Sequence, residues 1–284
     1  MIDPYLLSIA LSPWGLLVLG LVIGSFLNVV IHRMPLILDQ QWKLDAAAAL
    51  EQPEPAHEPI SLSQPASRCP ACGHAIRWYE NIPLISWLVL RGKCSACATP
   101  ISVRYPLIEL TTGLLFAACG WRFGHEPTVL LWCGFVAVLV AASAIDWDTT
   151  ILPDDLTLPL LWAGLVAAGM GWTLPLKDAL WGAVSGYLSL WSVYWLFKLT
   201  TGKEGMGYGD FKLLAALGAW LGWSMVLPVI LGSSVIGALV GIGLKLTGGL
   251  REGRYVPYGP FLAGAGLVMA FAGRDTVMGW LGWV

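Results

Sequence analysis

Charged residues are scarce in this sequence, and their scarcity argues against a soluble globular protein. Only 12% of the 284 residues are charged, 57% are hydrophobic, and the mean hydropathy is +0.70. Soluble domains carry about a quarter charged residues, roughly twice the share found here. The composition therefore predicts an all-α polytopic membrane protein.

Three further features are missing: an excess of basic residues, the features of a cleaved signal peptide, and an internal repeat. Lys and Arg (16) do not exceed Asp and Glu (18), which gives no reason to expect a nucleic-acid partner, and the 16 tryptophans fit membrane interfaces better. Residues 1–31 have no basic segment before their apolar stretch and no convincing small-residue cleavage site, so we expect a retained first transmembrane helix. No internal repeat of useful length is present.

Long uncharged runs predict where the chain crosses the bilayer. About 20 apolar residues span a hydrocarbon core of about 30 Å. The run at 213–244 is long for one span, and Gly222 and Pro228 interrupt it, so we interpret it as two spans. About eight transmembrane helices are therefore expected, in the runs 4–32, 110–121 (reaching 106 if Glu109 lies inside), 127–145, 156–176, 179–197, 213–244 and 255–273.

The basic residues predict the orientation. Thirteen of the sixteen Lys and Arg fall in 32–105, 198–212 and 245–254. The positive-inside rule then places these loops in the cytosol and both termini outside. The resulting domains are a first transmembrane helix (1–31), a cytosolic metal-binding domain (32–105) whose proline-rich first part resembles an extended linker, and a transmembrane core (106–284).

Two cysteine pairs lie in the large polar loop. Cys69 and Cys72 form one Cys-x-x-Cys pair, and Cys94 and Cys97 form the second. Four thiolates make a closed tetrahedral shell that suits structural Zn²⁺. Free or disulfide-bonded cysteines are the alternative, and a cytosolic location disfavours the disulfides.

The remaining candidate ligands are weaker. His74 lies beside the first pair and could compete as a metal ligand. Cys119 and Cys133 lie in apolar runs, where we expect small core residues.

Two carboxylates mark the cytosolic ends of apolar runs. Asp146 ends the run at 127–145, and Asp210 opens the run at 213–244 after Gly207 and Gly209. If the two acids converge, their charges repel, one stays protonated near neutral pH, and the pair has the chemistry of an aspartyl protease. The glycines would let an extended substrate strand approach the catalytic backbone.

Less specific interpretations remain open for these acids. A lone Gly-x-Gly-Asp is common in turns. Asp148, Asp154 and Asp155 fit solvated or helix-capping roles, and Asp155 is well placed to cap a helix from 156. An ion- or proton-coupled transporter using the two aspartates, and a scaffold that recruits partners through its metal loop, are the rival functions.

Six ordered motifs carry a resemblance to a known family. They are the cysteine pairs and the segments 24–35, 104–110, 146–154, 207–212 and 257–261. With them the sequence resembles the prepilin peptidases, the type IV leader peptidases of bacterial pilus and type II secretion systems, which belong to the Gly-x-Gly-Asp intramembrane aspartyl proteases. The resemblance implies that Asp146 and Asp210 are catalytic and that the substrates are prepilins and pseudopilins with short basic leaders.

The resemblance also implies a second activity and a location. Bifunctional members methylate the new N-terminal residue with S-adenosylmethionine, but no glycine-rich cofactor motif places that site here. Glu109 and Lys212 are candidates for positioning substrate or tuning the acids, and an anchoring role is an equal alternative. The expected location is the bacterial inner membrane, with the zinc loop and active site on the cytosolic side; the oligomeric state stays undetermined.

Overall fold

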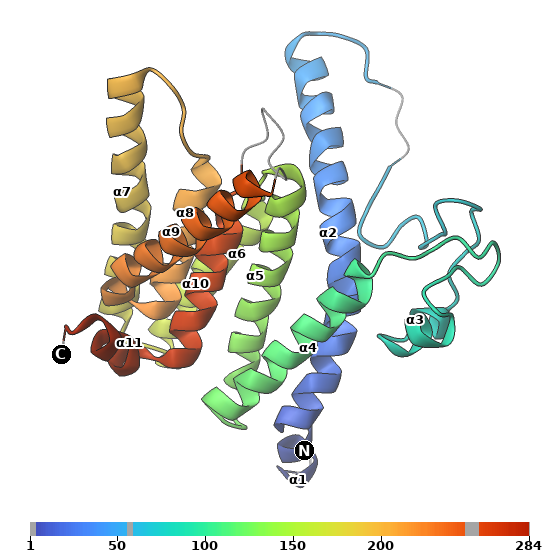
Figure 1. Cartoon of the computed structure of the whole chain (residues 1–284), viewed down its shortest axis with the longest axis horizontal. Coiled ribbons are helices and arrows are strands. Elements are labelled where there is room, and N and C mark those ends of the chain that lie inside the picture. Colours follow the sequence, from blue (N-terminus) through green and yellow to red (C-terminus); the bar gives the residue numbers. More distant parts are fainter. Residues whose placement is uncertain (1–3, 56–58, 248–255, 284) are drawn as a thin grey trace. The chain divides into compact units, whose positions relative to one another are not determined.

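The computed structural model describes residues 4–55, 59–247 and 256–283, and within them the chain is built from helices (Figure 1). The chain divides into two compact units, residues 1–137 and 138–284. The elements are α1 (Pro4–Ala10), α2 (Pro13–Ala49), η1 (Trp78–Asn81), α3 (Ile85–Val89), α4 (Arg104–Phe123), α5 (Val129–Thr149), α6 (Asp154–Gly169), α7 (Leu176–Thr201), α8 (Tyr208–Leu221), α9 (Trp223–Leu246), α10 (Gly259–Ala272) and α11 (Arg274–Leu281). The all-helical expectation is confirmed.

Fewer helices than expected meet the length and composition needed to cross a bilayer alone. In the described residues these are α2, α5 and α9, and the pair α10 and α11, bent by 108°, is a fourth candidate. The expected count of eight is therefore not confirmed. Two of the other helices are short: α6 has 16 residues and α8 has 14, below the roughly 20 that a perpendicular span requires.

The run at 213–244 is divided where the sequence interruption predicts. α8 ends at Leu221 and α9 begins at Trp223, with Gly222 between them at φ +87°. A side chain is strained in this left-handed region, so glycine suits the reversal. The start of the last predicted run, at residue 255, and the basic residues Arg251 and Arg254 lie outside the described residues.

The first long helix extends further than its apolar run. α2 continues to Ala49 and includes Pro35, so it extends well beyond the expected first span, whereas the described proline-rich residues 52–55 and 59–65, where we expected an extended linker, contain no helix. The Ala-rich stretch before residue 50 has high helix propensity, which explains the continuation. The loop beyond α2 returns to it, because the Arg33 guanidinium donates to the carbonyls of Ser61 and Pro65 at 2.9 and 2.6 Å.

Glycines bring helix backbones into direct contact in each unit. In the first unit, a Cβ built on Gly24 of α2 would lie 2.7 Å from the Cα of Glu109 in α4. In the second unit, α8 packs against α6, α7, α9 and α10. A Cβ on Gly182 of α7 would lie 2.0 Å from the carbonyl oxygen of Gly218 in α8. Such small-residue contacts are a common way for helices to associate in lipid.

We expect Gly182→Ala to destabilise the second unit by about 1–3 kcal/mol, because the added methyl has no room against the α8 backbone. The measurement is thermal unfolding of the purified protein in detergent. Gly241→Ala in α9 is the matched control, since nothing lies within 4 Å of its Cβ position. Equal melting temperatures for the two variants would contradict the close α7–α8 contact.

Candidate functional site

Asp146 lies near the end of α5 and is only 5% exposed. Its Oδ2 accepts a 3.0 Å hydrogen bond from the backbone N–H of Gly259, the first residue of α10. A Cβ on Gly259 would lie 2.5 Å from that same oxygen. Glycine is therefore what allows the N-terminus of α10, with its partial positive charge, to approach this carboxylate.

Asp210 lies in the first turn of α8 and is 8% exposed. Gly207 is the N-cap of this helix, its carbonyl accepts a 3.3 Å hydrogen bond from the Asp210 N–H, and a Cβ built on it would lie 3.9 Å from Asp210 Oδ2. Asp146 lies near enough for its charge to influence the Asp210 carboxyl group. The second unit thus brings together, at two helix N-termini, the two carboxylates that the sequence marked at separate spans.

Leu152 is a residue of this site that the sequence did not single out. It lies in the segment between α5 and α6. A Cβ on Gly209 would lie 2.6 Å from Leu152 Cβ, and a Cβ on Gly259 would lie 3.0 Å from Leu152 Cδ1. The same leucine therefore contacts both glycines beside the two carboxylates.

Lys212, a candidate for tuning the acids, pairs with a different carboxylate. Its Nζ is 2.7 Å from both oxygens of Asp154 at the start of α6. This ion pair joins the first turns of α6 and α8, which places Lys212 in an anchoring contact. Asp155 is exposed in the first turn of α6 and is not its N-cap, a position that Pro153 takes.

The segment 257–261 gains a structural explanation. The Tyr258 hydroxyl is hydrogen bonded to Ser233 Oγ (2.6 Å) and Ser234 Oγ (3.2 Å) of α9, which holds the start of α10. The ring of Phe261 packs edge-on against Trp147, the residue after Asp146. The Gly and Pro residues of this segment indicate a helix start in the sequence. They do not reveal that this helix start contacts α9 and Trp147.

Glu109 is buried in the first unit, away from solvent. Its Oε2 accepts a 2.8 Å hydrogen bond from the backbone N–H of Leu84, and Ser25 of α2 bonds to the same carboxylate. Leu84 has φ +58° and directly precedes α3. Of the two roles left open for Glu109, the contacts favour anchoring, because they tie the loop to α4 and α2.

The four predicted cysteines form one cluster. The sulfurs of Cys69, Cys72, Cys94 and Cys97 all lie within 4.8 Å of one another, and Cys69 Sγ is 3.8 Å from Cys97 Sγ. Zinc–sulfur bonds of about 2.3 Å in a tetrahedron place neighbouring sulfurs about 3.8 Å apart. All four thiols are free, so the cluster fits a metal ion and the disulfide alternative is not observed.

Each cysteine pair sits in a similar turn. In the first, the Gly73 N–H donates to Cys69 O and the Cys69 N–H to His74 O, each at 2.9 Å. In the second, the Ala98 N–H donates to Cys94 O at 3.0 Å and the Cys94 N–H to Thr99 O at 2.9 Å. Gly73 and Ala98 both have positive φ, +72° and +58°. Glycine is unstrained at this position, whereas alanine is strained.

Each of these turns also lowers the pKa of one of its cysteine thiols. Hydrogen bonds from the backbone of Cys72 and Ala71 lower the pKa of Cys69. Bonds from the hydroxyl and backbone of Thr99 lower the pKa of Cys97 to about 6. Although a backbone contact at His74 acts in the opposite direction, the neighbouring cysteine side chains raise the pKa of Cys72 to about 12. The turns therefore favour the thiolate, the form that binds metal, at Cys69 and Cys97.

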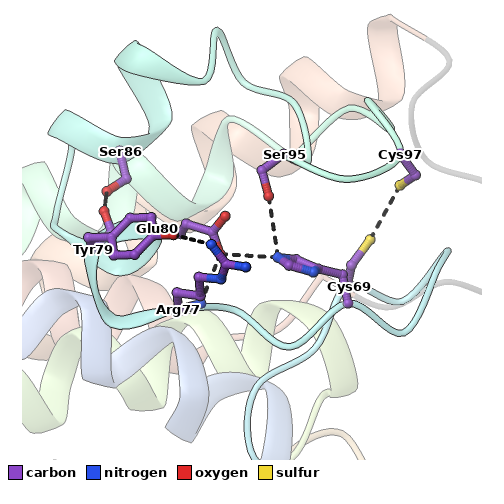
Figure 2. A network of polar contacts seen from close by, with 8 residues as sticks. Cys69, Arg77, Tyr79, Glu80, Ser86, Ser95 and Cys97 are labelled. Atoms are coloured by element: carbon purple, nitrogen blue, oxygen red, sulfur yellow. Dashed lines mark hydrogen bonds and ion pairs between the residues drawn. The ribbon is translucent and has the colours of Figure 1, made fainter.

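His74 does not join the cysteine cluster. Its Nε2 is 3.2 Å from Glu80 Oε2 and 3.3 Å from Ser95 Oγ. Figure 2 shows Glu80, Arg77 and Tyr79 on one side of this polar network and Ser95 with Cys97 on the other. Cys119 and Cys133 are buried in the first unit, as expected for core residues.

Comparison with known proteins decides the family. The model of the bacterial peptidase A24 N-terminal domain matches residues 18–123, and that of the type IV leader peptidase family matches residues 133–242. A prepilin leader peptidase/N-methyltransferase of Stutzerimonas stutzeri is 54% identical over 93% of this chain and 92% of its own length. The chain belongs to the type IV leader peptidase family.

Other relatives agree. Proteins of the same name from Pseudomonas putida and Aeromonas hydrophila are 52% and 50% identical over 91% and 92% of this chain, and each match covers 90% of the relative. No solved structure matches the chain. The transporter interpretation is not supported by these relatives.

The two turns generate a test of the metal cluster. We expect Ala98→Gly to retain zinc more strongly and Gly73→Ala to lose it more readily, because a left-handed backbone conformation costs alanine about 1 kcal/mol relative to glycine. Zinc release to a colorimetric chelator measures this, with a several-fold change in opposite directions. Two changes in the same direction would contradict the parallel between the turns.

Proposed function

We propose that this chain is a membrane-embedded aspartic endopeptidase that removes the basic leaders of type IV prepilins and type II secretion pseudopilins and then methylates the new N-terminus. The observation that carries the peptidase assignment is the meeting of two buried carboxylates, Asp146 and Asp210, in a member of the type IV leader peptidase family. The names of the relatives support both activities.

The chemistry follows from the carboxyl pair. Two adjacent carboxyl groups share a proton, so one can take a proton from water while the other donates to the scissile carbonyl oxygen. Water then adds to the carbonyl carbon, and collapse of the tetrahedral intermediate releases the new amine. The Gly259 N–H fixes the orientation of Asp146.

The glycines support binding of an unwound substrate. A helix hides its amides in internal hydrogen bonds, so the scissile peptide must be extended before attack. Gly207 and Gly209 leave backbone without side chains beside Asp210, and Leu152 now occupies the space against Gly209. We propose that Leu152 contacts the residues flanking the scissile bond when substrate is present.

The metal and the methyl donor serve the second activity. We propose that Cys69, Cys72, Cys94 and Cys97 hold a structural Zn²⁺, which supplies folding free energy to a loop with little apolar core. S-adenosylmethionine supplies an electrophilic methyl group for the new N-terminal amine. The domains we propose are the first span (1–31), the zinc-binding domain (32–105) and the protease core (106–284).

The proposed location is the bacterial inner membrane, with about eight crossings and with the zinc loop and carboxylates on the cytosolic side. The concentration of Lys and Arg in 32–105, 198–212 and 245–254 supports this orientation. A prepilin leader is basic and stays in the cytosol by the same rule. Its cleavage site would then lie at the depth of the two acids.

We expect Asp146→Asn and Asp210→Asn each to lower prepilin cleavage by about 10²–10⁴-fold, because each removes one partner in proton transfer. Purified protein and a synthetic prepilin, analysed by mass spectrometry, give the rate. Asp155→Asn is the matched control, since Asp155 is exposed in α6. Substantial cleavage by either of the first two variants would reject the carboxyl pair.

Gly259→Ala tests the backbone contact to Asp146. The added methyl would overlap Asp146 Oδ2, so we expect cleavage to fall about 10²-fold through misplacement of the carboxylate. Gly264→Ala on the same helix has an open Cβ position and should cleave like the parent. Equal rates for both variants would show that the Gly259 contact is dispensable.

A further inference from the structure

A cavity of about 500 Å³ lies in the first unit, next to the cysteine cluster. Ile85 and Val89 of α3 line one part of it, and His74 and Ser95, one from each cysteine turn, line another. Small-molecule sites commonly enclose about 300–1,000 Å³ and combine apolar walls with a few polar groups. The cavity has the size and mixed lining of such a site, and the peptidase chemistry does not use it.

The polar wall centres on Glu80. Its carboxylate accepts a 2.8 Å hydrogen bond from the Arg77 N–H and lies 3.2 Å from His74 Nε2, which in turn lies 3.3 Å from Ser95 Oγ, and its side chain is 10% exposed. The bonds from Ser95 and from the Arg77 backbone lower the pKa of Glu80 to about 2, so it carries a full negative charge at neutral pH. Figure 2 shows these groups in one network.

A positive group lies in the same wall. The Arg77 guanidinium is hydrogen bonded to the Tyr79 hydroxyl and lies 5.8 Å from the centre of that ring. The cavity therefore presents an anionic group, a cationic group, an aromatic ring and the apolar side chains of α3. An amino acid zwitterion attached to an adenosine matches all four.

We propose that this cavity is the methyl-donor site and binds S-adenosylmethionine, with its ammonium group at Glu80, its carboxylate at Arg77 and its adenosine against Ile85 and Val89. This inference rests on the proposed methyltransferase function. In the transfer, the lone pair of the new N-terminal amine attacks the methyl carbon, the carbon–sulfur bond breaks with its electrons going to sulfur, and the amine releases a proton to solvent.

The position of the cavity connects the metal to methylation. His74 follows Cys72 by two residues, and Ser95 directly follows Cys94. A metal that fixes both cysteine turns also fixes these two side chains against Glu80. On the other side, the Glu109 carboxylate holds Leu84 at the start of α3, which carries the apolar wall.

Direct binding tests the polar wall. Isothermal titration of the zinc-loaded, full-length protein in detergent with S-adenosylmethionine should give a Kd at least about tenfold higher for Glu80→Gln and for Arg77→Gln, because each loses a charged partner. Lys43→Gln, which alters an exposed pair with Asp39 on α2, should bind like the parent. Zinc content and prepilin cleavage should stay unchanged in all three.

Filling the cavity tests the apolar wall without touching the polar network. Val89→Trp should abolish donor binding, because the indole would occupy the adenosine position. Leu88→Trp is the matched control: Leu88 is the preceding residue of α3, its exposure (67%) is close to that of Val89 (74%), and it does not line the cavity. We expect it to bind the donor normally.

The outcomes separate this inference from the function on which it rests. A parent protein that neither binds S-adenosylmethionine nor methylates a cleaved pilin would contradict the methyltransferase assignment itself. A parent that binds, with Glu80→Gln, Arg77→Gln and Val89→Trp binding equally well, would overturn the cavity alone. Normal donor binding with lost methylation in these variants would place the pilin N-terminus there and would also overturn it.

Discussion

The second unit depends on the burial of two neighbouring carboxyl groups in an apolar helical protein. Removing a carboxylate from water is costly unless hydrogen bonds replace its hydration, and a second carboxylate beside it adds repulsion. The N–H of Gly259 donates to Asp146 and replaces part of its hydration. Asp146 lies against the start of α10 and Asp210 lies in the first turn of α8, and the N–H groups at a helix start have no partner within the helix. The packing of α5, α8 and α10 places the two carboxylates beside these N–H groups.

The glycines around the two acids follow from the same constraint. A backbone N–H reaches a carboxylate only if no side chain intervenes, which is why position 259 tolerates no Cβ. The ion pair between Lys212 and Asp154 fixes the start of α8 against α6, and the Tyr258 hydroxyl fixes the start of α10 against α9. Residues that do not touch the carboxyl pair therefore determine where its hydrogen-bond donors lie.

The first unit is held together differently, because its polar loop has little apolar core. Two cysteine turns concentrate four thiols, and the side chains next to those thiols build one wall of the cavity. Glu109 supplies a second attachment by holding Leu84 in a left-handed conformation before α3. A four-cysteine cluster on one side and a buried carboxylate on the other thus define the same small cavity.

The sequence by itself determined the features that short segments encode. Apolar runs predict helices, Gly222 predicts the break between α8 and α9, and two Cys-x-x-Cys pairs predict a metal cluster. Each of these patterns can be recognised within a short stretch of the chain. The length of α2 was missed, since a polar but Ala-rich stretch carries helix propensity without an apolar pattern. Only the tertiary structure decided that Gly259 donates to Asp146, that Leu152 contacts Gly209, and that Lys212 pairs with Asp154. These contacts join segments distant in the chain, and the packing of whole helices brings them together.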